Sequence, residues 1–167
     1  LYRQIAAQDQ VIVAAMGNER RDGSPTSWPA AYPGVTAVGA LDLNDGVAVF
    51  STHGDHIAIS APGVDILATM PTYKGVSYWT TRPGSNGQPV RHQPVHWTSF
   101  RGNLSGTSMA SPQVAGAAAL FVAKFGRGAA QFRQKLETSA RKISAMGGQN
   151  FTVDHGYGCL DVAALLR

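Results

Sequence analysis

The sequence lacks the features that define several protein classes. Its single cysteine, Cys159, excludes an intrachain disulfide, which is the usual cross-link of small secreted folds. Cys159 lies in a short apolar run, so we expect a buried thiol that packs as a small hydrophobe. No apolar run approaches the roughly 20 residues that a membrane-spanning helix needs, and no signal-peptide pattern is present, so we expect no membrane partner.

Charged residues are also scarce, at 14% of 167 residues, and the net charge is +4. A basic excess can reflect nucleic-acid binding, an acidic substrate or solubility alone. The basic residues of the C-terminal third follow predicted helices without interleaved aromatic residues that could stack on bases, so we expect a solvated helix face and no nucleic-acid partner. These residues are Lys124, Arg127, Arg133, Lys135, Arg141 and Lys142.

Short apolar runs that alternate with helical patterns predict an α/β fold with a mostly parallel sheet. Residues 11–15 and 35–41 are continuous apolar runs, as expected of strands buried on both faces. Residues 56–60 and 65–69 predict two further strands, and Asp45-Gly46 predicts a hairpin turn. The length suits one domain.

A segment rich in Gly, Pro, Ser, Thr and aromatic residues, 71–103, predicts a long loop with a hairpin at 76–81. Within it, His92 and His96 are four residues apart, a spacing that on a helix presents both rings to one metal ion. Pro94 between them disfavours that helix, so we expect no metal site there.

Helical patterns dominate the chain after this loop. An apolar helix is predicted to begin near Ser108 and to end at Gly126. Pro112 requires the start near Ser108, because proline is tolerated in a first turn and not in a helix interior. An amphipathic helix follows at about 129–140, and a short last helix is expected after Asp161 as its N-cap.

The main functional signal is Gly-Thr-Ser-Met-Ala-Ser-Pro at 106–112, where a helix begins. The start of a helix favours negative charge, and a serine there can offer its own backbone N–H to a developing oxyanion. By itself, a serine before a helix is most often an N-cap. A second motif, Ala-Ala-Met-Gly-Asn-Glu at 14–19, ends the first strand, where ligands of α/β sheets bind; alone, Gly17-Asn18 would be a turn.

Together these motifs resemble the subtilisin-like serine protease family, peptidase S8. Residues 106–120 are similar to the nucleophile motif of that family, and 14–19 to the strand end that supplies its oxyanion asparagine. Further stretches follow in the family's order at 28–40, 50–54, 61–66 and 156–161. The resemblance implies that residues 1–167 are the C-terminal part of a single subtilisin-like catalytic domain of three layers, incomplete because the N-terminal half is absent.

The resemblance also implies roles for individual residues. Ser108 would be the nucleophile of a serine endopeptidase, and Asn18 would join the Ser108 N–H in the oxyanion hole. In the stretch at 28–40 the proline that matches Pro29 is cis in the family. Gln113 stands where the family most often has His, at a position outside the triad. The pocket for the residue before the cleaved bond would be lined by Ala15, Met16, Gly17 and Ala30.

The Asp and His of the family's triad are missing. The family presents them as D-[ST]-G and H-G-T-H upstream of the strand that ends at Asn18, and neither pattern occurs here. His53 and His56 precede Ser108 but lie in stretches that match other parts of the family. Because a serine hydroxyl needs a base held by a third group, we expect the chain alone to be nearly inert. Its expected partners are a polypeptide substrate and an N-terminal segment that carries Asp and His.

Two alternatives stay open. The chain could be a subtilase-like fragment that binds peptides or proteins without cutting them. An α/β-hydrolase is also conceivable, because 106–110 approximates G-x-S-x-G and Asp154 and His155 lie downstream. Against this, 100–105 is not an apolar strand, and adjacent residues are poorly placed for two triad roles.

No cofactor is expected from the sequence. Calcium sites are frequent in the resembled family, and a weaker one uses backbone groups near Ala30, Tyr32 and Val35 together with acidic side chains. His56 and Ala58 stand where those acids would align, so we expect no tightly held ion. By resemblance alone, a secreted or periplasmic location is favoured.

Overall fold

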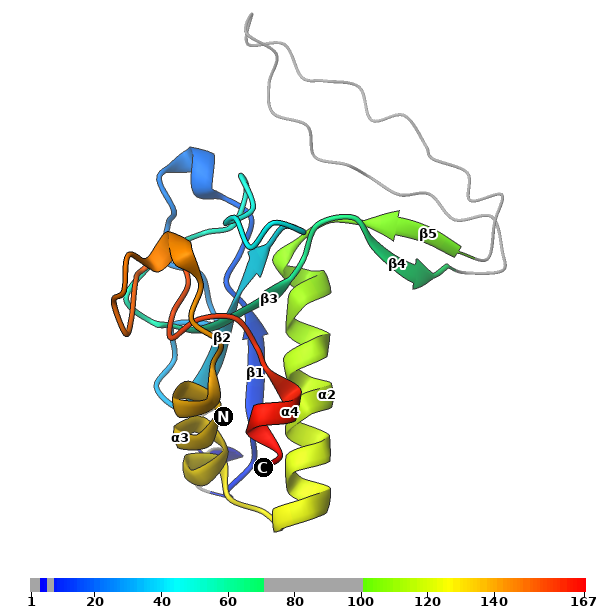
Figure 1. The fold of residues 1–167 in the computed structure, drawn as a ribbon, viewed down its shortest axis with the longest axis vertical. Helices are drawn as coiled ribbons and strands as arrows, with labels where there is room; N and C mark the ends of the chain where they lie inside the picture. The colour runs from blue at the N-terminus through cyan, green and yellow to red at the C-terminus, as the bar shows by residue number, and fades with distance from the viewer. Residues whose placement is uncertain (1–3, 6–7, 71–100) are drawn as a thin grey trace, which may run out of the picture. The chain divides into compact units, whose positions relative to one another are not determined.

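The computed structural model describes residues 4–5, 8–70 and 101–167 (Figure 1). The chain forms two compact units, 1–66 with 104–167 and, separately, 67–103. The elements, in order, are β1 (Ile12–Ala15), β2 (Val35–Leu41), β3 (Ile57–Pro62), β4 (Ile66–Thr69), β5 (Arg101–Leu104), α2 (Thr107–Phe125), α3 (Ala129–Ser139) and α4 (Val162–Leu165), with short 3-10 turns at Arg20–Asp22 and Ser144–Met146. The hairpin predicted at 76–81 and the pair His92 and His96 lie outside the described residues.

The larger unit is built on a parallel sheet with strand order β1-β2-β3. Every residue of β2 is buried, as its unbroken apolar run predicts for a central strand. The turn at 42–46 follows β2, and the Asp42 carboxylate closes it by accepting hydrogen bonds from the N–H groups of Asn44 (2.8 Å) and Gly46 (2.9 Å). The smaller unit contains most of β4 and β5, which pair with each other.

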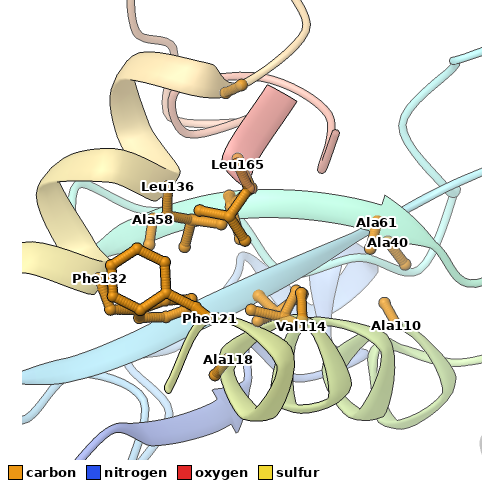
Figure 2. Close-up of a cluster of buried hydrophobic side chains, with 14 of the residues drawn as sticks. Ala40, Ala58, Ala61, Ala110, Val114, Ala118, Phe121, Phe132, Leu136 and Leu165 are labelled. Atoms are coloured by element: carbon orange, nitrogen blue, oxygen red, sulfur yellow. The ribbon is translucent and has the colours of Figure 1, made fainter. Parts of the chain in front are cut away.

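The helices α2, α3 and α4 pack on one face of this sheet, where they share a core with β2 and β3 (Figure 2). Ala110, Val114 and Ala117 of α2 are buried there, and such small side chains let the helix lie close to the strands. Phe121 of α2 meets Phe132 of α3 edge to face, with ring centroids 5.6 Å apart. The position of α2 is therefore fixed by close packing.

The opposite face of the sheet has its own, smaller core. Ala14, Ala37 and Ile57 from the three strands are buried there, and Ala30 and Phe151 from loops cover them. Side chains of adjacent strand residues point to opposite faces, so each strand contributes to both cores. The sheet is thereby fixed on both sides, although only one side carries the helices α2 to α4.

Most predicted element boundaries are confirmed, and one inference is wrong. Strands β1 and β2 and helix α3 match their predicted ranges, and the Asp161 carboxylate accepts a hydrogen bond from the Ala164 N–H at 2.8 Å as an N-cap. Helix α2 begins at Thr107, next to the predicted start at Ser108, but this start places Pro112 beyond the first turn, so the inference that the proline must lie in the first turn is wrong. Pro112 cannot donate to the Ser108 carbonyl, and the adjacent Gln113 instead adds side-chain hydrogen bonds to Pro62 O (2.7 Å) and Met109 O (3.1 Å).

Cys159 is free and buried, as predicted from its apolar neighbours. Burial raises the pKa of its thiol, an effect that the nearby Arg141 opposes only in part. No helix among the described residues is long and apolar enough to cross a membrane.

Gly156 lies where the C-terminal loop packs closely against β3. Its φ is +63°, and a Cβ there would overlap the backbone of Ala58. We expect Gly156→Ala to lower the free energy of unfolding by about 2 to 4 kcal/mol, from left-handed strain and overpacking together.

The matched control is Gly116→Ala in α2, where a Cβ would meet nothing within 4 Å. It should raise the free energy of unfolding by about 0.5 to 1 kcal/mol, because alanine favours the helix. Urea unfolding of both variants followed by circular dichroism measures the difference, and equal midpoints would contradict the packing described.

Candidate active site

Asn18 leaves the sheet at the carboxyl end of β1. The Met16 N–H still donates to Val38 O at 2.9 Å, which continues the parallel ladder one residue past the strand. Gly17 then adopts φ +105°, a conformation that favours glycine, and a Cβ there would lie 3.0 Å from the Thr52 hydroxyl. The chain therefore turns sharply and leaves the Asn18 side chain exposed at the sheet edge.

Ser108 is the second residue of α2 and is exposed. Gly106 precedes the helix, and its N–H donates to Gly63 O at 2.8 Å, which anchors the start of the helix to the segment after β3. The N–H groups of the first helical turn point towards this end and give it a partial positive charge. Ser108 thus lies where a negative charge on a ligand would be stabilised.

Thr107 joins these two elements through the side chain of Asn18. Asn18 Oδ1 accepts hydrogen bonds from the Thr107 N–H and from the Thr107 hydroxyl, each at 3.0 Å. A backbone N–H can only donate, so the amide atom facing it must be the oxygen. Asn18 Nδ2 is consequently left with both of its donors directed away from this contact.

Gly106 provides a common reference point for the two candidate donors. A Cβ on Gly106 would lie 3.5 Å from Asn18 Nδ2 and 3.6 Å from the Ser108 backbone nitrogen. Both nitrogens therefore border the same small space beside the residue that precedes α2. Two N–H donors that converge in this way can bind a single oxyanion.

The four residues expected to line a substrate pocket fall into two groups. Met16 and Ala30 are buried, with 0% and 1% of their surface exposed, and belong to the core behind the sheet. Ala15 and Gly17 are half-buried, and Gly17 lies beside Ser27, whose Cβ would be 3.5 Å from a Cβ on Gly17. The bond between Trp28 and Pro29 is cis, as the resemblance implies.

Asp154 and His155 have structural partners. Asp154 accepts a hydrogen bond from Arg20 at 2.7 Å; burial raises the pKa of this carboxyl, but the guanidinium outweighs burial and the net shift is downward. His155 is buried, and its Nδ1 lies 2.9 Å from the Thr152 hydroxyl. Among the described residues neither side chain hydrogen-bonds to Ser108. Asp154 and His155 therefore do not form a catalytic triad with Ser108, as the α/β-hydrolase interpretation requires. In addition, β5, the strand before Ser108, pairs with β4 and not with the parallel sheet.

The residues of the weaker calcium site do not fit that ion. The Val35 carbonyl already accepts a hydrogen bond from the Arg133 guanidinium at 3.2 Å, and the Tyr32 carbonyl accepts one from the Val35 N–H at 3.1 Å. His56 and Ala58 supply no anionic oxygen. A cationic side chain thus occupies a carbonyl that calcium would need.

Comparison with known proteins decides the family. The model of the subtilase family, Peptidase_S8, matches residues 2–159. The chain belongs to the subtilase family. The thermophilic serine proteinase of Bacillus sp. strain AK1 is 41% identical over 138 residues, which cover 82% of this chain and 27% of that protein. Subtilisin DY of Bacillus licheniformis is 36% identical over 157 residues, which cover 92% of this chain and 46% of that protein.

The fold of this subtilase chain has a close counterpart among solved structures. The crystal structure of fervidolysin from Fervidobacterium pennivorans, a keratinolytic enzyme related to subtilisin, matches with a TM-score of 0.74 and 33% identity. The match covers 96% of this chain and 23% of fervidolysin, so the α/β class with a mostly parallel sheet is confirmed. The chain spans less than half the length of each of these relatives.

Sequence reasoning missed two residues that shape this subtilase site. Thr107 lies in the nucleophile motif, but its hydrogen bonds to Asn18 span 89 residues, so no local pattern indicates them. Thr52, whose hydroxyl accepts a hydrogen bond from the Glu19 N–H at 2.9 Å, likewise has no local signal because 33 residues separate the two.

His155 makes stability depend on pH. Burial lowers the pKa of His155 below its ordinary value near 6.5, and Asp154 opposes this only in part. The folded state therefore binds fewer protons than the unfolded state, and the contribution of His155 to stability is complete above 6.5 and lost as the pH falls below it. Its Nε2 is buried without a hydrogen-bond partner, so a proton there would be unpaired.

We expect His155→Gln to reduce the loss of stability between about pH 7 and pH 5, because glutamine does not titrate. Urea unfolding of the wild type and the variant at several pH values within this range measures the effect. If both proteins lose the same free energy of unfolding across the range, His155 is not the titrating group.

Proposed function

We propose that residues 1–167 are the C-terminal part of a subtilisin-like catalytic domain that hydrolyses peptide bonds. Ser108 is the nucleophile, and Asn18 Nδ2 and the Ser108 N–H stabilise the oxyanion. The observation that carries this proposal is the pair of hydrogen bonds from Thr107 to Asn18 Oδ1, which leaves Nδ2 beside the Ser108 nitrogen. By family membership alone, we also propose a secreted or periplasmic location.

The reaction requires a base that the described residues do not place at Ser108. The Ser108 oxygen attacks the carbonyl carbon of the substrate while its proton passes to a base, which later protonates the leaving amine. Water then releases the acyl group from Ser108 by the same steps. The described part of the chain contains no histidine hydrogen-bonded to Ser108, and we propose that the base and its supporting acid are supplied by an N-terminal segment.

The edge of the sheet supports such a segment as a partner. Strand β1 ends the strand order of the parallel sheet, so among the described residues one of its edges pairs with no strand. A groove of about 580 Å³ lies beside β1 and α2 and is lined mainly by Val11, Val13, Ala118, Ala119, Val122 and Ala123. A second strand on β1 would satisfy its free backbone groups, and apolar side chains would fill the groove.

The polypeptide substrate would reach the site along the turn that carries Asn18. We propose that Ala15 and Gly17 contact the substrate residue before the cleaved bond. The buried Met16 and Ala30 would form the wall behind them. A fragment that binds peptides without cutting them is the second candidate, and the absence of a base at Ser108 among the described residues favours it.

Complementation tests the proposal directly. The chain is expected to be nearly inert alone and to become an active peptidase when mixed with the corresponding N-terminal part of subtilisin DY, which supplies the missing base. Hydrolysis of a chromogenic peptide and labelling of Ser108 by a fluorophosphonate are the measurements. Asn18→Ala should lower kcat of the complex by about 10² to 10³, which is the loss that removal of one oxyanion donor causes in subtilisin.

Ser108→Ala is the control for labelling, and it should abolish both signals. Rapid labelling of the isolated chain would contradict the need for a partner. A complex that forms on a sizing column but cleaves no peptide would favour the binding fragment.

A further inference from the structure

Thr52 bonds to the backbone on both sides of Asn18. Its N–H donates to Gly17 O at 3.0 Å, and its hydroxyl oxygen accepts from the Glu19 N–H at 2.9 Å. Only 1% of Thr52 is exposed, so these hydrogen bonds are shielded from water. The residue thereby holds the peptide groups that enter and leave Asn18.

The hydroxyl proton of Thr52 completes a small network. Thr52 Oγ1 donates to Glu19 Oε2 at 3.3 Å, and the same carboxylate oxygen accepts from the Asn18 N–H at 2.6 Å. The Asn18 and Glu19 N–H groups and the buried hydroxyl therefore all have partners. Removing the hydroxyl would leave the Glu19 N–H and one carboxylate contact unmade.

The segment before Thr52 extends this support along the turn. The Arg20 N–H donates to Phe50 O at 3.1 Å, and the Arg20 guanidinium donates to Ser51 O at 3.3 Å. Residues 50–52 thus run beside residues 17–20 and form hydrogen bonds with their backbone groups. The buried hydroxyl of Ser51 does not contact this turn; its oxygen accepts a hydrogen bond from the Ala40 N–H in β2 at 3.1 Å.

Two threonines consequently fix different parts of Asn18. Thr107 holds the side-chain oxygen, whereas Thr52 holds the backbone from which that side chain extends. An amide fixed only at its oxygen can still pivot when its Cα moves, and a displacement of Nδ2 by about 1 Å weakens its contact with an oxyanion severely. The direction of Nδ2 therefore depends on both residues.

We propose that Thr52 is a positioning residue: its buried hydroxyl holds the turn that carries Asn18 and so sets where Nδ2 points beside the Ser108 N–H. The proposal rests on the proposed function, in which Nδ2 acts on the oxyanion. Thr52 does not contact the reacting atoms, so its effect on the reaction passes through Asn18.

Thr52→Val removes the hydroxyl and keeps the shape of the side chain. In the active complex with the N-terminal segment, we expect kcat to fall by about tenfold to hundredfold with KM changed by less than about twofold. Thr52→Ser restores the hydroxyl and should recover most of kcat. The matched control is Ser51→Ala, which also removes a buried hydroxyl but should leave kcat unchanged.

The decisive measurement repeats Thr52→Val in the Asn18→Ala background. If Thr52 acts through Asn18, the second substitution causes no further loss of kcat. The proposal is overturned if Thr52→Val retains the wild-type kcat or if Ser51→Ala lowers kcat by the same factor. It is also overturned if Thr52→Val lowers kcat by the same factor in the Asn18→Ala background as in the wild type.

A complex without any activity would count against the proposed function, and the positioning role is then decided separately. Hydrogen exchange of the Glu19 amide in the 167-residue chain should be faster in Thr52→Val than in the wild type and in Thr52→Ser. Equal protection in all three proteins would overturn the role of Thr52.

Discussion

The two hydrogen bonds from Thr107 to the side-chain oxygen of Asn18 are the constraint on which the site depends. They join the carboxyl end of β1 to the first residue of α2, and 89 residues separate the two positions in sequence. Contacts that distant are formed only at a cost in chain entropy, so packing elsewhere must hold the two ends together. The buried small residues of α2, such as Ala110 and Val114, provide it by fixing the helix against β2 and β3.

In the proposed site, Asn18 would serve stability with its side-chain oxygen and chemistry with its side-chain nitrogen. Its oxygen caps α2, whose own N-cap, Gly106, has no side chain to do so, and such a cap is worth about 0.5 to 2 kcal/mol. Its nitrogen is left as a donor at the start of the helix. Because capping fixes the orientation of the amide, the donor is held in place before any ligand arrives, which is the condition for effective oxyanion stabilisation.

Local patterns predicted those parts of the molecule that depend on local rules. The continuous apolar runs gave the buried strands β1 and β2, and Asp161 was recognised as a helix cap because capping acts over a few residues. The contact between Thr52 and Glu19 could not be predicted, since neither residue has a periodicity or spacing that points to the other. The start of α2 near Ser108 was predicted correctly, but the inference that Pro112 must lie in the first turn was wrong, because packing against the sheet holds the helix in spite of an interior proline.

In the proposed site, the oxyanion donors and the general base are separate groups, so a chain can hold the donors without holding the base. The proposed oxyanion donors are a backbone N–H and an amide, and the chain's own sheet, helix and threonine hydrogen bonds would position both of them. A general base must instead approach Ser108 from outside the first turn of α2, and the exposed side of that residue is open to it. An anion-binding site can therefore exist without the base. Affinity for an oxyanion and the rate of acyl transfer are separable properties of this fold.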